Sequence, residues 1–236
     1  SIKVANLMPP LSSEQGGKET VNNSTELFRY CTSVGVYEGY SKKEKAHIVT
    51  ARMPDDVVNA GGQRFIRHYL DEYQFMVWLV CHATIISEDD MYEAASDLWY
   101  ECDIQPKKPI IRSYRELREK KLLAMSQAEE KEVSLYEIGT QIQPYTISLS
   151  SSIFAQRSFR VLKNALWNTI KGNFLPKEEK KIFKFFSGNK GYTFFDYAKK
   201  EDIMENESYL AVGKSIKNLL QKGYMCPVGW CFMPSD

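Results

Sequence analysis

The sequence lacks the features that mark most enzymes. It has no glycine-rich phosphate-binding loop, no dinucleotide-binding glycine pattern and no serine or cysteine nucleophile in a known setting. Only three of its 236 residues are histidine, and His47, His68 and His82 show no partner spacing that would complete tetrahedral zinc ligation. We therefore expect a binding protein that is not an enzyme and that needs no metal and no cofactor.

Long apolar runs and a secretory signal are also missing. No apolar run approaches the roughly 20 residues that cross a bilayer, since even the run at 75–80 is soon followed by His82 and Glu88. The first residues contain no basic region followed by an apolar stretch. The five cysteines are odd in number and widely scattered, which is typical of reduced thiols. We expect no membrane contact and an intracellular protein, either cytoplasmic or nuclear.

The composition does supply a large core. Hydrophobic residues make up 43% and charged residues 26%, and 14 Tyr, 12 Phe and 4 Trp offer apolar faces for packing or stacking. The length fits one large or two modest domains. Residues 1–25 are rich in proline, glycine, serine and asparagine, which predicts a flexible arm. We predict a mostly helical, acidic domain at 26–145 and a basic domain at 146–236.

Local patterns predict mainly helices in the first domain. Irregular or short extended structure is expected at 28–40. Apolar spacing predicts a helix between 65 and 80, and Ser87 with the acidic residues after it predicts a helix start. A long polar helix is expected at 113–131. No internal repeat is visible in the sequence.

The charge is balanced overall but not along the chain. The net charge is +1, with +6 on residues 151–236 and −5 on the remainder. The stretch from Arg157 to Lys190 contains nine lysines and arginines and only two glutamates, which makes it a candidate phosphate-binding surface. The alternative is that these lysines and arginines lie on helix faces that only contact solvent. The predicted helix at 152–171 carries part of this charge.

Two blocks of opposite charge follow one another in the first domain. Seven acids lie between Glu88 and Asp103 with no base among them, and seven bases lie between Lys107 and Lys121. The acids at the start of the first block suit the first turn of a helix, where free amides favour negative charge. These blocks could pair within the fold or between copies of the protein, and we expect pairing within the fold.

The last sixty residues predict three short helices and a hairpin. Helices are expected at 177–187, 193–203 and 208–222, the last ending at Gly223. Two short apolar segments around Val228 and Gly229 then predict a small β-hairpin. This order of elements resembles the winged-helix module, a helix-turn-helix fold, from about residue 175. The expected fold class is mainly α, with a helical N-terminal domain and a C-terminal winged-helix-like domain.

The resemblance implies where nucleic acid would bind. In winged-helix proteins that bind DNA, the third helix enters the major groove and the wing touches the backbone. Together with the basic run, this nominates Arg157, Arg160, Lys163, Lys180, Lys181, Lys184, Ser208, Tyr209, Lys214, Ser215, Lys217, Asn218 and Trp230. Acidic residues between Glu201 and Glu207 would repel a phosphate backbone near this helix.

Three functions fit these patterns. The first is a nucleic-acid-binding protein, DNA more than RNA, whose N-terminal domain serves assembly or recruitment. The second is a helical viral coat or nucleoprotein that binds RNA nonspecifically. The third is a winged-helix scaffold that makes only protein contacts. A protein partner or self-association is expected in each case.

Overall fold

The computed structural model describes residues 27–82, 84–105, 107–146, 167–168, 170–188, 191–203 and 209–233. Within these residues the chain is 50% helix and 25% strand, and its strands form two sheets. The predicted mainly α fold with a helical N-terminal domain is therefore wrong, and the protein is a mixed α/β structure. The predicted arm and most of the predicted helix at 152–171 lie outside the described residues.

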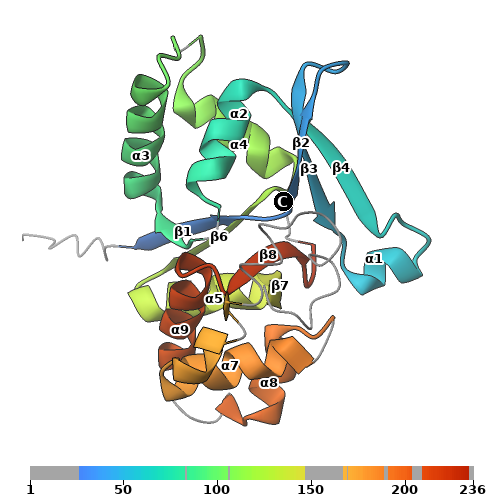
Figure 1. Ribbon diagram of the computed structural model, residues 1–236, viewed down its shortest axis with the longest axis vertical. Helices are drawn as coiled ribbons and strands as arrows, with labels where there is room; N and C mark the ends of the chain where they lie inside the picture. Colours follow the sequence, from blue (N-terminus) through green and yellow to red (C-terminus); the bar gives the residue numbers. More distant parts are fainter. Residues whose placement is uncertain are drawn as a thin grey trace, which may run out of the picture.

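The strands belong to both halves of the chain. A three-stranded antiparallel sheet has the order β5-β1-β6. A five-stranded sheet has the order β2-β3-β8-β7, and β4 pairs with the other edge of β3 (Figure 1). The strands are β1 (Phe28–Ser33), β2 (Val36–Ser41), β3 (Ala46–Arg52), β4 (Phe65–Leu70), β5 (Ile86–Ser87), β6 (Leu123–Ala128), β7 (Ile142–Thr146) and β8 (Met225–Trp230).

Helices cover these sheets and fill the lower part of Figure 1. In the first half, α2 packs on β3, β4 and its neighbours α3 and α4, and in the second half α7 and α5 pack on α9. The helices are α1 (Asp55–Asn59), α2 (Glu72–Val80), α3 (Glu88–Glu101), α4 (Ile110–Glu119), α5 (Lys131–Gln141), α7 (Lys177–Gly188), α8 (Phe194–Lys200) and α9 (Tyr209–Gln221), with one 3-10 turn, η1 (Gly172–Phe174).

The pattern read as one helix at 65–80 is a strand followed by a helix. β4 pairs with β3, and its exposed and less exposed residues alternate as a strand requires. Asp71 then starts α2 with a capping box, in which its side chain accepts from the amide of Gln74 at 2.8 Å. The Gln74 side chain accepts in return from the Asp71 amide. The prediction missed this helix start.

The long helix expected at 113–131 is also wrong, because the chain turns after Glu119. Lys121 has a positive φ of 54°, and the Leu122 amide reaches back to the Leu117 carbonyl at 2.9 Å. This is a left-handed helix cap made without glycine. The chain continues as β6, which pairs with β1 along its full length.

The three helices expected near the C-terminus correspond to α7, α8 and α9, but the hairpin is wrong. Residues Met225–Trp230 form the single strand β8. It pairs antiparallel with β7 and touches β3 through Gly229 opposite Arg52. The Gly35 amide also donates to the Pro227 carbonyl at 2.8 Å. Backbone partners from far away in the sequence therefore replace the second strand of the hairpin. The boundary near residue 145 falls at the end of β7 and stays a prediction.

The fold contains an internal repeat that the sequence did not reveal. In one unit, β1 is followed by α2, α3, α4 and β6, and β6 pairs antiparallel with β1. In the other, β7 is followed by α7, α8, α9 and β8, and β8 pairs antiparallel with β7. We call these unit 1 and unit 2. Unit 1 has β2, β3, α1 and β4 between β1 and α2 and has β5 before α3; unit 2 has η1 before α7 among the described residues, and α5 joins the units.

The two units agree in detail. The amides of Leu122 and Tyr224 close the third helices by the same bond, to Leu117 and Leu219, and each bond is 2.9 Å long. The following strand begins one residue later in each unit. In both units an amide side chain also joins the first helix to the third: Gln74 Nε2 donates to Glu116 Oε2 at 2.8 Å, and Asn218 Nδ2 donates to Glu179 Oε1 at 2.9 Å. Equivalent residues in the third helix and the strand after it differ by 102 in number.

Candidate nucleic-acid interface

Only part of the predicted recognition helix is accessible. Lys214 is exposed on α9, but Ser215 is 8% exposed and lies in the core. Tyr209 is half-buried against Tyr136, with 5.6 Å between the ring centroids. The nomination of Ser215 as a surface contact is corrected by its burial. Ser208 lies outside the described residues.

The remaining predicted contacts of α9 have structural partners. The Lys217 ammonium lies 5.7 Å from the centre of the Tyr30 ring. Its pKa is lowered by burial and by nearby Lys131, while Asp90 acts in the opposite direction. The Asn218 amide is engaged by Glu179, which is buried. These contacts leave Lys214 as the freely exposed base in the middle of α9.

Trp230 is not on a surface wing. Its side chain is 1% exposed, and its indole nitrogen donates to the carbonyl of Lys121 at 2.9 Å. Because Lys121 ends the third helix of unit 1, this bond ties the last strand of unit 2 to unit 1. Its nomination as a nucleic-acid contact is corrected, since a buried indole cannot reach a ligand.

The basic run before α8 is only partly described. Arg157, Arg160 and Lys163 lie outside the described residues. On α7, the ammonium of Lys180 donates to the Asn173 carbonyl at 2.8 Å, and Lys181 lies 3.3 Å from a carboxylate oxygen of Glu201. Lys184 is exposed. The structure therefore gathers no dense basic patch from the nominated residues that it describes.

Packing against α5 explains why α9 is partly covered. A Cβ atom on Gly213 would lie 2.7 Å from the backbone nitrogen of Tyr136 and 2.9 Å from the carbonyl oxygen of Glu132. The absence of a side chain at Gly213 thus lets the two helix backbones approach closely. Gly139 of α5 in turn makes room for Ile216 of α9.

The equivalent helix of unit 1, α4, presents a more open basic face. Ser113, Tyr114 and Leu117 of α4 are buried. Arginines at every third position lie on the exposed side: Arg112, Arg115 and Arg118. The segment 107–121 holds seven bases and two acids, a net charge of +5.

One arginine of this row and a lysine before the helix belong to a polar cluster. Glu116 accepts from the ammonium of Lys108 at 2.6 Å and from Arg112 Nε at 3.0 Å. Hydrogen bonds from Lys108 above all, with further ones from Gln74 and Arg112, lower the pKa of Glu116 to about 2. Burial would lower the pKa of Lys108, but its bonds to Asp71 and Glu116 raise it overall. The cluster fixes the start of α4 against α2.

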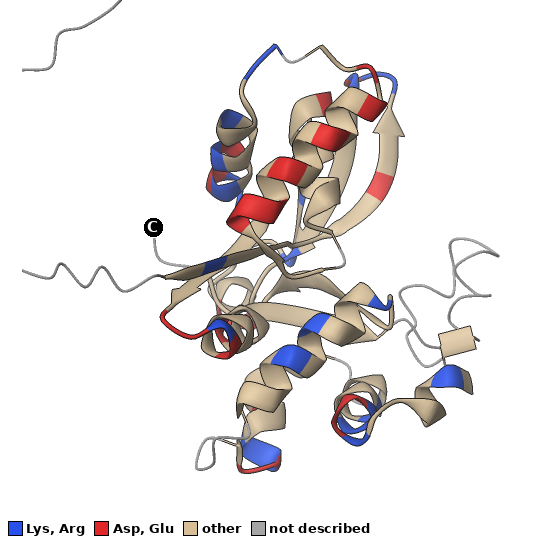
Figure 2. Ribbon diagram, turned by 90° about the vertical axis from the view of Figure 1, so that its left-hand side faces the viewer, with Lys and Arg blue, Asp and Glu red and all other residues tan. Residues whose placement is uncertain are grey.

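The expected pairing of the acidic block with the basic block is not what fixes these arginines. The ion pairs of Lys108 and Arg112 go to Asp71 and Glu116, neither of which belongs to α3. Figure 2 shows the acidic residues of α3 in a row facing the viewer, with α4 and its basic residues beside it. Glu88 pairs with Arg29 at 3.7 Å. Sequence reasoning found these arginines but assigned them to pairing with α3.

Other kinds of site find little support among the described residues. There, no group of three or more His, Cys, Asp or Glu side chains is placed to hold a metal ion. No helix in the same part of the chain is long and apolar enough to cross a membrane. Neither protein-family models, nor curated proteins, nor solved structures give a match to this chain. The exposed side chains of the described residues are therefore what indicates the function.

Proposed function

We propose that the protein binds duplex DNA through α4. The observation that carries this proposal is the row of three exposed arginines on the third helix of unit 1. The helices α3 and α4 follow one another as the two helices of a helix-turn-helix do, although residues 102–109 make a longer connection than the three or four residues of that motif. In such pairs the second helix lies in the major groove.

The spacing of the arginines suits this role. Residues three apart rise by about 4.5 Å along a helix, so the row from Arg112 to Arg118 extends over about 9 Å. The major groove, roughly 12 Å wide, admits a helix of this kind. Guanidinium groups bind phosphate oxygens in pairs and also match the acceptor edge of guanine. Lys107, Lys120 and Lys121 add positive charge at the two ends of α4.

The acidic face of α3 limits how DNA can approach. Asp89, Asp90, Glu93 and Asp97 are exposed and form no ion pair with another described residue. Carboxylates beside a phosphate backbone repel it, and the repulsion grows as the salt concentration falls. The duplex therefore contacts α4 on the side away from α3.

The proposal prefers α4 over α9 for a geometric reason. The third helix of unit 2 packs on α5 at Gly213, and its Lys217 lies over Tyr30. The third helix of unit 1 keeps all three of its arginines on the surface. A helix that enters a groove needs an open face along its length, and α4 has the more continuous one.

Binding can be measured with a fluorescent duplex of about 12 base pairs, a little more than one helical turn. Anisotropy titrations at about 50 mM and about 200 mM salt compare the wild type with the variant Arg115→Gln/Arg118→Gln. We expect weaker binding by the variant, and a salt slope reduced by about 0.9 for each phosphate that the variant no longer neutralises.

Two matched variants sharpen the test. Lys177→Gln/Lys184→Gln removes the same charge from α7 and should leave affinity unchanged. Lys214→Glu/Lys217→Glu tests α9, and loss of binding in this variant alone would move the interface to unit 2. The proposal fails if the arginine variant binds as well as the wild type, or if no salt-sensitive binding occurs. Preference for an RNA oligomer, with a rise in light scattering on adding RNA, would favour the coat-protein alternative.

A further inference from the structure

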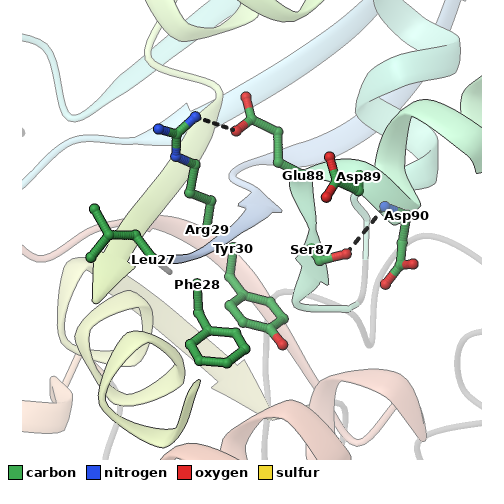
Figure 3. A pocket seen from close by; sticks show the side chains of 8 residues that line it. All are labelled: Leu27, Phe28, Arg29, Tyr30, Ser87, Glu88, Asp89 and Asp90. Carbon is green, nitrogen blue, oxygen red and sulfur yellow. Dashed lines mark hydrogen bonds and ion pairs between the residues drawn. The ribbon is translucent and has the colours of Figure 1, made fainter. Parts of the chain in front are cut away.

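A recess on one face of the molecule is lined by apolar side chains of β1 together with charged and polar side chains. It has a volume of about 500 Å³ and lies between the start of β1 and the start of α3. Leu27 is 40% exposed and Phe28 is 39% exposed, while Tyr30 is buried and lines the inner part. Figure 3 shows Phe28 and Tyr30 on one side of β1 and Arg29 reaching to Glu88 on the other. Such side chains at a surface recess are typical of a contact site.

Acidic residues border this recess on one side. Ser87, Glu88, Asp89 and Asp90 line it, and the acidic row continues along α3 through Glu93 to Asp97 and Glu101. Of these acids, Glu88 forms an ion pair with Arg29. The remaining acids of the row are exposed, so this side offers a stripe of negative charge along one helix.

Basic residues border the recess on the opposite side. Lys217 of α9 lies over the ring of Tyr30, and Lys131 is close enough to lower its pKa further. Lys214 lies one helical turn before Lys217 and is exposed. In Figure 2 the red row of α3 and the blue bands of α9 face the viewer together, one above the other, with β1 between them. The face therefore has an acidic edge, an apolar centre and a basic edge.

We propose that a second copy of this chain docks on this face. A two-fold axis that lies in the interface, between the two charged rows, brings α3 of each copy against α9 of the other. The same rotation brings the two recesses, with Leu27 and Phe28 of each copy, together at the centre. Each contact is then made twice, as in the isologous interfaces of two-fold dimers.

Charge complementarity selects this occupant. A nucleic acid would gain at α9 but would be repelled by the unpaired acids of α3, and an acidic or basic partner would suit only one edge. A copy of the chain itself carries both edges at the matching separation, because they are the same two edges. The apolar centre with a charged rim is the usual anatomy of a protein interface.

The pairing also places opposite charges against exposed residues of each edge, such as Lys214 of α9 and Glu93 and Asp97 of α3. Lysines of α9 cover the partner's α3 carboxylates and shield them from the surroundings. Self-association goes beyond the proposed DNA binding and does not require it, so it can be measured in the absence of nucleic acid.

Charge reversal tests the arrangement directly. Variant A is Lys214→Glu/Lys217→Glu, which reverses the charge of the basic edge, and variant B is Glu93→Lys/Asp97→Lys, which reverses the charge in the middle of the acidic edge. By light scattering at about 100 μM, well above a micromolar dissociation constant, the wild type should have twice the chain mass of 27.3 kDa. Each variant alone should have the mass of one chain. An equal mixture of A and B should regain the double mass, because both edges are again matched.

The controls separate this arrangement from general effects. Lys42→Glu/Lys43→Glu reverses two exposed lysines of the β2–β3 turn, on the far side of the molecule in Figure 1, and should stay dimeric. Circular dichroism checks that each variant is folded, and Lys214→Glu alone replaces variant A if Lys217, which is half-buried, is needed for folding. Phe28→Asp should also yield the single-chain mass. A wild type of single-chain mass, a dimer that survives both reversals, or a mixture of A and B that stays at single-chain mass would each overturn the proposal.

Discussion

Units 1 and 2 have the same order of three helices between two paired strands, but their third helices differ in what they contact. In unit 1, α4 keeps a row of arginines on the surface, whereas α9 in unit 2 is pressed against α5 through Gly213. The helix caps are the same in both units, and the strand that follows pairs antiparallel with the first strand of its unit, regularly in unit 1 and with a register shift in unit 2. The units therefore differ in which segments pack on their third helices, and not in the order of their helices and strands.

The hydrogen bonds that join the first helix to the third also differ between the units in how exposed they are. In unit 1 they involve Glu116, whose side chain is 24% exposed and has three polar partners. In unit 2 they involve Glu179, whose side chain is 5% exposed and is held by Asn218 and Lys222. The contact in unit 2 is therefore the more enclosed of the two.

The largest effect is expected where the last strand of unit 2 meets unit 1. Trp230→Ala removes a buried ring and its hydrogen bond to Lys121, and should destabilise the protein by about 3–5 kcal/mol. Urea unfolding followed by far-ultraviolet circular dichroism measures this. Phe232→Ala, at a partly exposed ring just beyond β8, serves as control and should change stability by about 0.5 kcal/mol. Equal losses in both variants would mean that Trp230 has no special role in joining the units.

A smaller effect is expected where α5 meets α9. Gly213→Ala places a methyl group against the backbone of α5, which cannot move aside as a side chain could, and should cost about 1–3 kcal/mol. The sign is informative, because alanine normally stabilises a helix by about 1 kcal/mol relative to glycine. An increase in the urea midpoint would contradict the close packing that distinguishes α9 from α4.

The smallest effect concerns the hydrogen bonds of Glu116 in unit 1 and depends on pH. Because hydrogen bonds, chiefly from Lys108, lower the pKa of Glu116 from 4.5 to about 2, ionised Glu116 stabilises the folded state. This contribution is complete above pH 4.5 and is lost as the pH falls towards 2. We expect it to be below about 1 kcal/mol, since the group is partly exposed.

The variant Glu116→Gln isolates this contribution. Its urea midpoint should fall less steeply than that of the wild type between pH 4.5 and 2. The exposed carboxylate Glu119, replaced in the same way, should leave the slope of the wild type unchanged. Parallel curves for wild type and Glu116→Gln would show that ionised Glu116 does not stabilise the folded state.

Local signals in the sequence were sufficient for some helices. Ser87 accepts from the Asp90 amide at 3.1 Å and starts α3, and Thr193 starts α8 with a capping box, as their side-chain chemistry predicts. The errors arose where a local signal was overlooked. The spacing of Asp71 and Gln74 is that of a capping box and could have separated β4 from α2.

Other errors could not have been avoided by local reasoning. Pro227 and Gly229 predict a turn, but β8 is extended because it pairs with β7 and β3, whose paired residues lie at least 79 positions earlier in the chain. The turn after α4 uses Lys121 in a conformation that normally favours glycine. Sheet pairing between distant segments overrides intrinsic preference in both places.

From the sequence, the candidate interface on α4 could be recognised only as a stretch rich in lysine and arginine. The bases between Lys107 and Lys121 were noticed, but their placement on one open helix face depends on which side of α4 packs against α2. The internal repeat was hidden for a similar reason. Its equivalent positions match in hydrogen bonding and backbone angle, while their side chains differ, as Lys121 and Gly223 do.

The position of β8 has a consequence for how the chain is built. This strand is synthesised after β7, its main partner, and after β3, which β2 and β4 already pair and which β8 meets only at Arg52, so β7 must wait unpaired until β8 has left the ribosome. Open strand edges are sites of misassembly. The nascent protein is thus most vulnerable to aggregation just before β8 is synthesised, and β7 becomes part of the five-stranded sheet only when β8 pairs with it.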